Sequence, residues 1–327
     1  MTDRRPATFG YHASHEQHAP SKLLEYVQLA EQAGFTTAMC SDHFHPWIEQ
    51  QGQSGFTWSW LGAALQATRL PFGCVNAPGW RYHPAIVAQA AATLCEMYPD
   101  RFWLAVGSGE ALNEHITGER WTVKSERNER LLECVTVMRR LWAGETVTHR
   151  GRIVVEEAKL YTLPAAQPPI YGAALSVETA AWVGSWADGL ITIGAPAAKL
   201  AELLDAFSSG GGAGKPVKVQ AALAWAPTKA EARDGAWSQW RGNVIGGDVL
   251  AILRTCADFE AAARFVTPDD VAACLPVSHD PLAHAERLQE YVDAGATDIY
   301  IFNVAPPQRE FIEVFAERVL PAVRGAR

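Results

Sequence analysis

Apolar and polar positions along the chain change their period repeatedly, and these changes predict strands alternating with helices. Short apolar runs rich in β-branched residues predict strands, whereas apolar residues spaced three or four positions apart predict helices. The expected strands cover residues 7–13, 35–41, 70–76, 101–107, 169–173, 189–193, 217–225 and 298–303. The expected helices cover residues 20–33, 56–68, 84–97, 125–142, 176–187, 197–207, 281–294 and 309–323.

This alternation predicts an α/β fold, a closed (β/α)8 TIM barrel with insertions. The chain has 327 residues, which by length alone would also allow two domains. The surplus over a barrel of about 250 residues falls near 145–160, where a hairpin is expected, and in the poorly patterned stretch 228–275. The glycine-rich run 208–215 is expected to be a loop, because the alternation continues beyond it. We therefore expect one domain over residues 1–327.

Composition narrows the class of protein and its partners. Hydrophobic residues make up 48% of the chain and charged residues 20%, which is typical of a globular protein. The net charge of −8 and the lack of a lysine or arginine cluster exclude nucleic acid as a partner. The sequence shows neither a signal peptide nor an apolar run long enough for a membrane span, so we expect a cytoplasmic protein. The six cysteines are scattered without a CxxC pair, and the four in apolar segments are expected to be reduced core thiols.

Candidate chemistry gathers where the predicted strands end, which is the active-site face of such a barrel. Four junctions, at residues 12–18, 41–47, 73–84 and 107–114, combine titratable groups with glycine and aromatic residues. This combination is typical of a ligand pocket. The chain has 12 tryptophans, and some of them are expected to wall this pocket. They are Trp47, Trp58, Trp60 and Trp80.

Two alternative interpretations of these junctions are weaker. His43 and His45 have the spacing of a metal-binding pair, but no histidine lies between His149 and His279 to complete a ligand set, so no metal is expected. Gly107 and Gly109 do not continue into a dinucleotide-binding fingerprint, because residue 112 is leucine. These glycines fit better as a turn that lets a planar ring or a phosphate approach the backbone.

Three segments together resemble a known family. Residues 41–47 (SDHFHPW), 81–89 (RYHPAIVAQ) and 107–114 (GSGEALNE) resemble, in order and spacing, the luciferase-like flavin/F420 oxidoreductases. The clade is that of the F420-dependent glucose-6-phosphate and alcohol dehydrogenases. The resemblance implies a homodimeric barrel with an isoalloxazine-type ring at its mouth. It also implies a non-prolyl cis peptide under the ring, at Cys74–Val75, a bond that is kept only where the backbone must meet the ring.

The resemblance also implies roles for individual residues. Asp42, His43, Trp47 and Glu110 would surround the reacting atoms. His43 is the expected base, because histidine can take a hydroxyl proton near neutral pH and a carboxylate partner would hold its tautomer. Trp47 would shape the pocket, and a buried Glu110 would exchange a proton with the ring. Glu16 and Trp80 are expected at the substrate. The residues expected at the cofactor are Asp42, Cys74, Val75, Gly107, Ser108, Gly109, Asn113, Ala173, Ala174 and Ser176.

Departures from the family pattern shape the expected substrate. In the sugar-phosphate branch a lysine and an arginine grip the phosphate, and Pro196 and Cys274 stand at those positions here. A small neutral or apolar substrate is therefore expected. Leu175 and Ser176 replace a glycine pair at the cofactor phosphate, where Ser176 is expected to cap the next helix and donate to a phosphate.

The cofactor expected first is FMN, giving a flavin-dependent oxidoreductase that transfers hydride. With reduced flavin and a separate flavin reductase, monooxygenation is a further option. One alternative is an F420-dependent alcohol dehydrogenase, and another is a non-catalytic flavin-binding protein. Intact Asp42, His43 and Glu110 argue against the non-catalytic alternative, because binding alone needs no acid and base.

Overall fold

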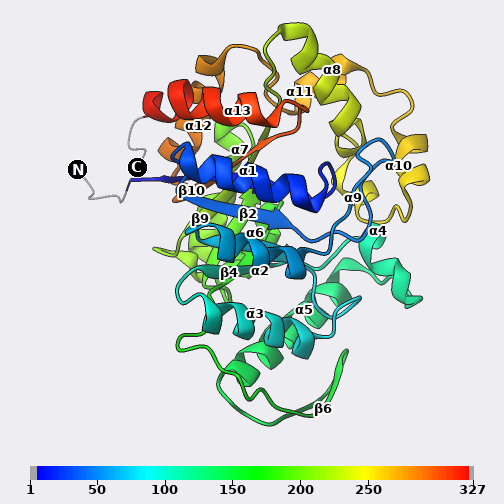
Figure 1. Ribbon diagram of the computed structural model, residues 1–327. Helices are drawn as coiled ribbons and strands as arrows, with labels where there is room; N and C mark the ends of the chain where they lie inside the picture. The colour runs from blue at the N-terminus through cyan, green and yellow to red at the C-terminus, as the bar shows by residue number, and fades with distance from the viewer. Residues whose placement is uncertain (1–5, 324–327) are drawn as a thin grey trace.

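The computed structural model describes residues 6–323, and eight of its strands form a closed parallel barrel (Figure 1). Around the barrel the order is β1-β10-β9-β8-β7-β4-β3-β2, and the pairing of β1 with β2 closes the ring. The predicted TIM barrel is therefore confirmed. The strands are β1 (Thr8–Ala13), β2 (Thr37–Ser41), β3 (Phe72–Asn76), β4 (Phe102–Val106), β7 (Ile170–Ala173), β8 (Gly189–Ile193), β9 (Val217–Leu223) and β10 (Asp298–Asn303).

Helices surround this barrel and bury one apolar face each against it. In the helix after β1, for example, Leu23, Val27 and Ala30 form the buried face. None of the described helices is long and apolar enough to cross a membrane. The outer helices are α1 (Pro20–Gln32), α2 (Thr57–Ala67), α3 (Pro84–Met97), α5 (Lys124–Trp142), α6 (Val177–Gly184), α7 (Ala197–Phe207), α12 (Pro281–Ala294) and α13 (Gln308–Val314).

The two expected insertions are present. β5 (Val147–Arg150) and β6 (Val154–Ala158) form the predicted hairpin, which projects from the lower end of the molecule in Figure 1. The second insertion is mainly helical. Its elements are α8 (Lys229–Trp240), η3 (Arg241–Asn243), α9 (Gly247–Leu250), α10 (Cys256–Ala262) and α11 (Pro268–Cys274).

The glycine-rich run after α7 is not the loop that the sequence analysis expects. Ser208–Gly212 forms one π-helical turn, η2, that continues α7. Gly210 packs so closely that a Cβ there would lie 2.0 Å from the carbonyl oxygen of Ala181. The glycines therefore allow two chain segments to touch rather than mark a flexible connection.

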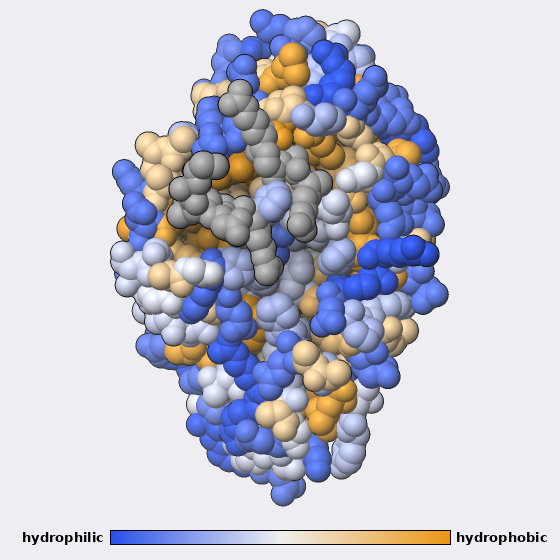
Figure 2. All heavy atoms as spheres, turned by 90° about the vertical axis from the view of Figure 1, so that its left-hand side faces the viewer, coloured by the Kyte–Doolittle hydropathy of each residue, from blue (hydrophilic) through white to orange (hydrophobic). Residues whose placement is uncertain are grey.

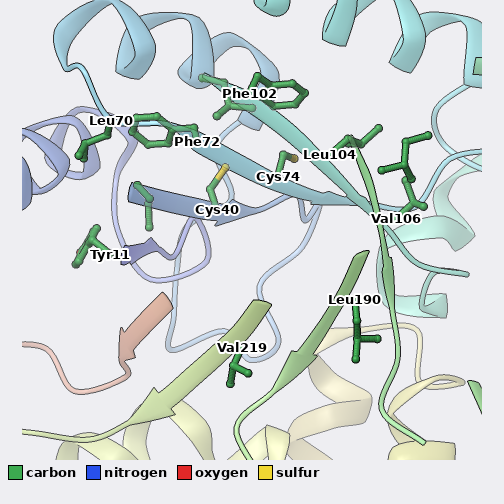
Figure 3. Close-up of a cluster of buried hydrophobic side chains, with 14 of the residues drawn as sticks. Tyr11, Cys40, Leu70, Phe72, Cys74, Phe102, Leu104, Val106, Leu190 and Val219 are labelled. Carbon is green, nitrogen blue, oxygen red and sulfur yellow. The ribbon is translucent and has the colours of Figure 1, made fainter. Parts of the chain in front are cut away.

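The apolar core has two layers, separated by the barrel wall. An inner cluster fills the barrel, and an outer cluster lies between strands and helices. Figure 3 shows outward-pointing residues of neighbouring strands, among them Cys40, Cys74 and Leu104. Trp58 and Trp60 of α2 belong to this outer cluster, so they stabilise the helix layer and do not wall the mouth.

The amino ends of the barrel strands face the left of Figure 1, and α4 (Ala111–Glu114), α9 and α10 lie on the right, beyond the carboxyl ends. Figure 2 shows the left-hand side, where hydrophilic residues dominate and apolar residues form small separate patches.

Thiol accessibility provides a direct test of this packing. All six cysteines are free, five are buried and Cys274 is exposed. Burial also raises the pKa of the Cys95 thiol to about 11 and that of Cys134 to about 12, which suppresses their reactive thiolates. A disulfide reagent is therefore expected to modify one thiol rapidly in the native protein and six in denaturant. Rapid modification of several native thiols would contradict the described core.

Candidate active site

Titratable side chains converge at the carboxyl ends of β1, β2, β3 and β4, which are neighbours in the barrel. Glu16 follows β1, His43 follows β2, and Glu110 follows β4 directly before α4. The fold therefore brings together residues from three separate junctions of the sequence.

His43 and Glu16 form the central pair. The buried Glu16 carboxylate accepts hydrogen bonds from Ser14 Oγ at 2.8 Å and Ser41 Oγ at 2.6 Å, and its Oε1 lies 3.4 Å from His43 Nδ1. Burial opposes ionisation of Glu16, but the nearby His43 and the Ser41 hydroxyl outweigh it and lower the pKa of Glu16 to about 2. Burial lowers the pKa of His43, with the Glu16 carboxylate acting in the opposite direction. A neutral imidazole beside a carboxylate is suited to accept a proton.

The neighbouring Asp42 is not the carboxylate partner of His43. Its Oδ2 accepts a hydrogen bond from Asn76 Nδ2 at 2.7 Å, and its Oδ1 accepts from the Tyr82 hydroxyl and from Arg81 Nη1. Successive side chains at a strand end point to opposite sides, so Asp42 and His43 enter different environments. Asp42 organises the surrounding loops, whereas His43 faces the mouth.

Arg81 joins three of these loops, a role that the sequence analysis missed although the residue lies in a quoted motif. Its Nη1 lies 3.3 Å from Asp42 Oδ1, and its Nε lies 3.2 Å from Glu114 Oε1. It also donates to the carbonyl oxygen of Asp42, and its backbone N–H donates to Glu114 Oε2. The Arg81 side chain is 6% exposed and both carboxylate side chains are 1% exposed. The guanidinium of Arg81 and the carboxylates of Asp42 and Glu114 are therefore buried together, and each charge needs its partner to offset the cost of leaving water.

Glu110, which is expected to exchange a proton with the ring, follows β4. The half-buried side chain makes no hydrogen bond or ion pair with any residue from 6 to 323. Burial, together with the charges of Glu114 and Glu16, raises the pKa of Glu110 to about 8. Glu110 is therefore protonated at neutral pH and has a proton to donate.

Trp47 is held between the base and the second insertion. Its ring lies 5.1 Å from the ring of His43 and 5.3 Å from that of Phe259 in α10, centroid to centroid. Its backbone N–H donates to Gln51 Oε1 at 2.8 Å. The helical insertion thus positions an expected pocket residue, and no signal in the sequence paired Phe259 with Trp47.

Small apolar residues at the ends of β3, β7 and β8, together with Gly107 after β4, form a low wall at the mouth. Val75 and Ala173 are half-buried and pack on the inner cluster. A Cβ at Gly107 would meet only the Cβ of Ala173, at 3.6 Å. Ile193, at the end of β8, is 49% exposed. A planar ring fits such a wall, because it offers little steric hindrance and few polar groups.

The expected cis peptide at Cys74–Val75 is wrong, because this bond is trans in the structure. Val75 pairs in register with Ser41 of β2 and Ala105 of β4, and this regular pairing continues through the bond. The Cys74 side chain points outward into the core, so only its backbone faces the ring wall.

Other expected cofactor residues take structural positions near the mouth. Asn113 Oδ1 accepts from the backbone N–H groups of Phe44 and His45 at 2.9 and 3.2 Å, which fixes the loop after β2. Ser176 caps α6 through the Thr179 N–H, as expected. The buried Ala174 donates its N–H to the carbonyl of Ile191.

The glycine turn after β4 and Trp80 lie along one edge of the site. Gly109 has a φ of 83°, which favours glycine, and Ser108 beside it is half-buried. The ring of Trp80 lies 5.0 Å from that of Trp121 and 3.9 Å from the Arg130 guanidinium. Trp80 is 7% exposed, so it supports the edge from beneath and has little surface for a substrate.

His12 is a further polar group at the inner end of the mouth. Its ring lies 4.3 Å from that of Phe302, its Nε2 is 3.5 Å from Gln220 Nε2, and its buried Nδ1 has no hydrogen-bond partner among the described residues. Burial lowers the pKa of His12 to about 4, so the ring is neutral. Its position at the end of the first predicted strand was the signal in the sequence that placed His12 near the mouth.

The residues from 6 to 323 contain no group of three or more side chains suited to hold a metal ion. Of the histidine pair in the alternative interpretation, His45 binds the carbonyl oxygen of Leu112 through Nδ1 at 3.0 Å and stacks on His115. His43 instead faces Glu16.

Comparison with known proteins identifies relatives along nearly the whole chain. Residues 6–298 match the family described as luciferase-like monooxygenase. An F420-dependent glucose-6-phosphate dehydrogenase of Microbacterium testaceum is 33% identical, covering 98% of both chains. An F420-dependent hydroxymycolic acid dehydrogenase of Mycobacterium tuberculosis is 35% identical, covering 95% of this chain and 87% of its own.

A solved structure agrees with these sequence relatives. An F420-dependent secondary alcohol dehydrogenase, in complex with an F420-acetone adduct, superposes with a TM-score of 0.91 and 31% sequence identity. The match covers 98% of this chain and 100% of that chain. This chain belongs to the luciferase-like monooxygenase family and is an oxidoreductase.

Proposed function

We propose that this protein is a coenzyme F420-dependent dehydrogenase that interconverts a neutral alcohol and its carbonyl compound. The observation that carries the proposal is the pairing of a neutral base with a protonated acid across one mouth: His43, held by Glu16, and Glu110. The three named relatives support the cofactor. Their names do not support FMN, which the sequence analysis puts first. The expected flavin reductase and homodimer stay predictions.

The residues at the mouth fit a deazaflavin ring. Val75, Gly107 and Ala173 offer a low apolar wall, and Glu110 offers a proton beside it. When bound, F420 supplies a two-electron acceptor that takes a hydride from the alcohol carbon.

His43 and Glu110 manage the two protons of this reaction. Glu16 Oε1, 3.4 Å from His43 Nδ1, favours the tautomer that carries its proton on Nδ1, which leaves Nε2 to take the hydroxyl proton as the carbonyl bond forms. Glu110 holds a proton at neutral pH and would supply the one that a bound deazaflavin takes up with the hydride. Trp47 packs on His43 and excludes water from the reacting atoms.

The charges at the mouth favour a neutral substrate. The ionised carboxylate of Glu16 faces it, Glu110 is neutral, and the guanidinium of Arg81 is already shared between Asp42 and Glu114. Pro196 and Cys274 supply no cation for a phosphate. A sugar phosphate would therefore bring negative charge toward the Glu16 carboxylate without gaining a cation at those two positions.

Cofactor titration tests the proposal. We expect coenzyme F420 to bind the purified protein, and secondary alcohols to bleach the visible absorbance of the bound deazaflavin. FMN is the competing ligand in the same titration. The proposal would be wrong if FMN bound more tightly than F420. It would also be wrong if no alcohol bleached the bound deazaflavin and no ketone drove the reverse reaction.

The pH profile of alcohol oxidation is expected to be bell-shaped. Below the pKa of His43, which burial lowers from its ordinary 6.5, the base is protonated and kcat/KM falls about tenfold per pH unit. Above about pH 8 the acid Glu110 is ionised and the rate falls again. Steady-state rates from pH 4.5 to 10 measure both limbs. The Glu110→Gln variant is expected to lose the alkaline limb; its persistence would assign that limb to another group.

A further inference from the structure

We infer that the substrate carries an extended aliphatic chain, which lies along an apolar rim formed by Phe44, Ile116, Val249 and Ile252. The inference rests on the proposed dehydrogenase function and names the class of alcohol: one with a long hydrocarbon portion.

The rim consists of large apolar side chains that the fold leaves open to solvent. Phe44 is 52% exposed, Ile116 41%, Val249 40% and Ile252 59%. They come from the segments after β2, after α4 and around α9. Contiguous exposed apolar groups beside a site indicate a binding surface, whereas single ones are ordinary.

Contacts with α4 show that these segments are neighbours. Asn113 of α4 holds the backbone of Phe44. The ring of Phe44 packs on His45, which stacks on His115 at 5.6 Å, directly before Ile116. The carbonyl oxygen of Ala251, between Val249 and Ile252, accepts from the Ala111 N–H at 3.2 Å and from Trp121 Nε1 at 2.9 Å. Figure 1 shows α4 and α9 together beyond the carboxyl ends of the strands.

The segments of the rim are joined to the reacting groups through α4 and a buried cluster. α4 begins immediately after Glu110. Beneath the rim lies a buried apolar cluster of Ile48, Leu112 and Phe259, against which Trp47 and Leu250 pack. This buried cluster connects Trp47, beside the base, with Leu250, two residues before Ile252. A substrate whose hydroxyl lies at His43 would place a long hydrocarbon chain over these segments, along the rim.

Hydrocarbon contact has a measurable signature. Burial of one methylene corresponds to about a threefold to fourfold gain in binding. For a series of 2-alkanols of increasing length, we expect kcat/KM to rise by up to about threefold per methylene until the chain passes the rim.

The test combines chain length with surface variants. In the double variant Phe44→Ser/Ile252→Ser the gain per methylene should shrink toward onefold. The matched control is Leu282→Ser in α12, an apolar residue of 47% exposure outside the rim, which should keep the wild-type gain. The inference would be wrong if kcat/KM of the wild type did not change with chain length, or if the double variant kept the wild-type gain per methylene.

Binding of the same alcohols, followed by calorimetry, separates this inference from the proposed function. Failure to oxidise any alcohol rejects the dehydrogenase. If affinity rises with chain length and this rise is lost in the double variant, binding of the chain along the rim is still supported. If affinity does not depend on chain length, the chain does not bind along the rim, even where short alcohols are oxidised.

Discussion

Replacing His43 with glutamine is expected to lower kcat for alcohol oxidation by about 10²- to 10⁴-fold, the usual contribution of a positioned general base. Glutamine keeps much of the side-chain volume beside Trp47 but cannot take the hydroxyl proton. Binding of coenzyme F420 should persist, because His43 acts on the substrate. Rapid-mixing measurement of deazaflavin bleaching, with a separate F420 titration, checks both statements.

Two companion variants make this result specific. Glu16→Gln removes the carboxylate that supports the pKa of His43, so the acid limb should move to lower pH while kcat falls. His149→Gln, on the β5–β6 hairpin where the ring pairs with Glu133, is the matched control and should keep the wild-type rate. A His43→Gln enzyme within tenfold of the wild-type rate would mean that another group is the base.

The fold could be predicted from the sequence wherever one face of an element packs on a large core. The strand and helix periods recover the barrel, but α8 buries Ala232, Gly235 and Ala236, whose small side chains leave little periodic signal. The capping boxes that begin at Thr228, Thr255 and Thr267 were the remaining sign of helices in this insertion. Capping chemistry identifies helix starts even where the apolar pattern fails.

The sequence could predict which residues lie at the candidate site, but not which of their side chains contact one another. Placement after a strand marked the junctions that contain His43 and Glu110, because all parallel strands end at the same face, and the family resemblance then chose these two residues. The partner of His43 depends on which neighbouring strand reaches it, and closure of the barrel brings Glu16 rather than the adjacent Asp42. Burial likewise separates Trp47 at the mouth from Trp60 in the helix layer, which composition cannot do.

Replacing Arg81 with leucine is expected to destabilise the protein by about 3–5 kcal/mol, the usual effect of removing one partner from a buried ion-pair group. The carboxylates of Asp42 and Glu114 would remain, each on a side chain only 1% exposed, without their shared cation. The free energy of unfolding from urea titration measures the loss. Activity should fall as well, because Arg81 also holds the backbone carbonyl of Asp42, next to His43.

The loss in the free energy of unfolding caused by Arg81→Leu should grow as the pH rises. Burial already raises the pKa of Glu114, and Arg81 acts in the opposite direction, so loss of the cation raises this pKa further and folding costs more as pH rises. The difference from wild type should therefore be largest near neutral pH and shrink as the pH falls toward 5. Arg287→Leu breaks an exposed pair with Glu290 and should cost about 0–1 kcal/mol. If both variants lose the same small amount at every pH, Arg81 does not neutralise two buried charges.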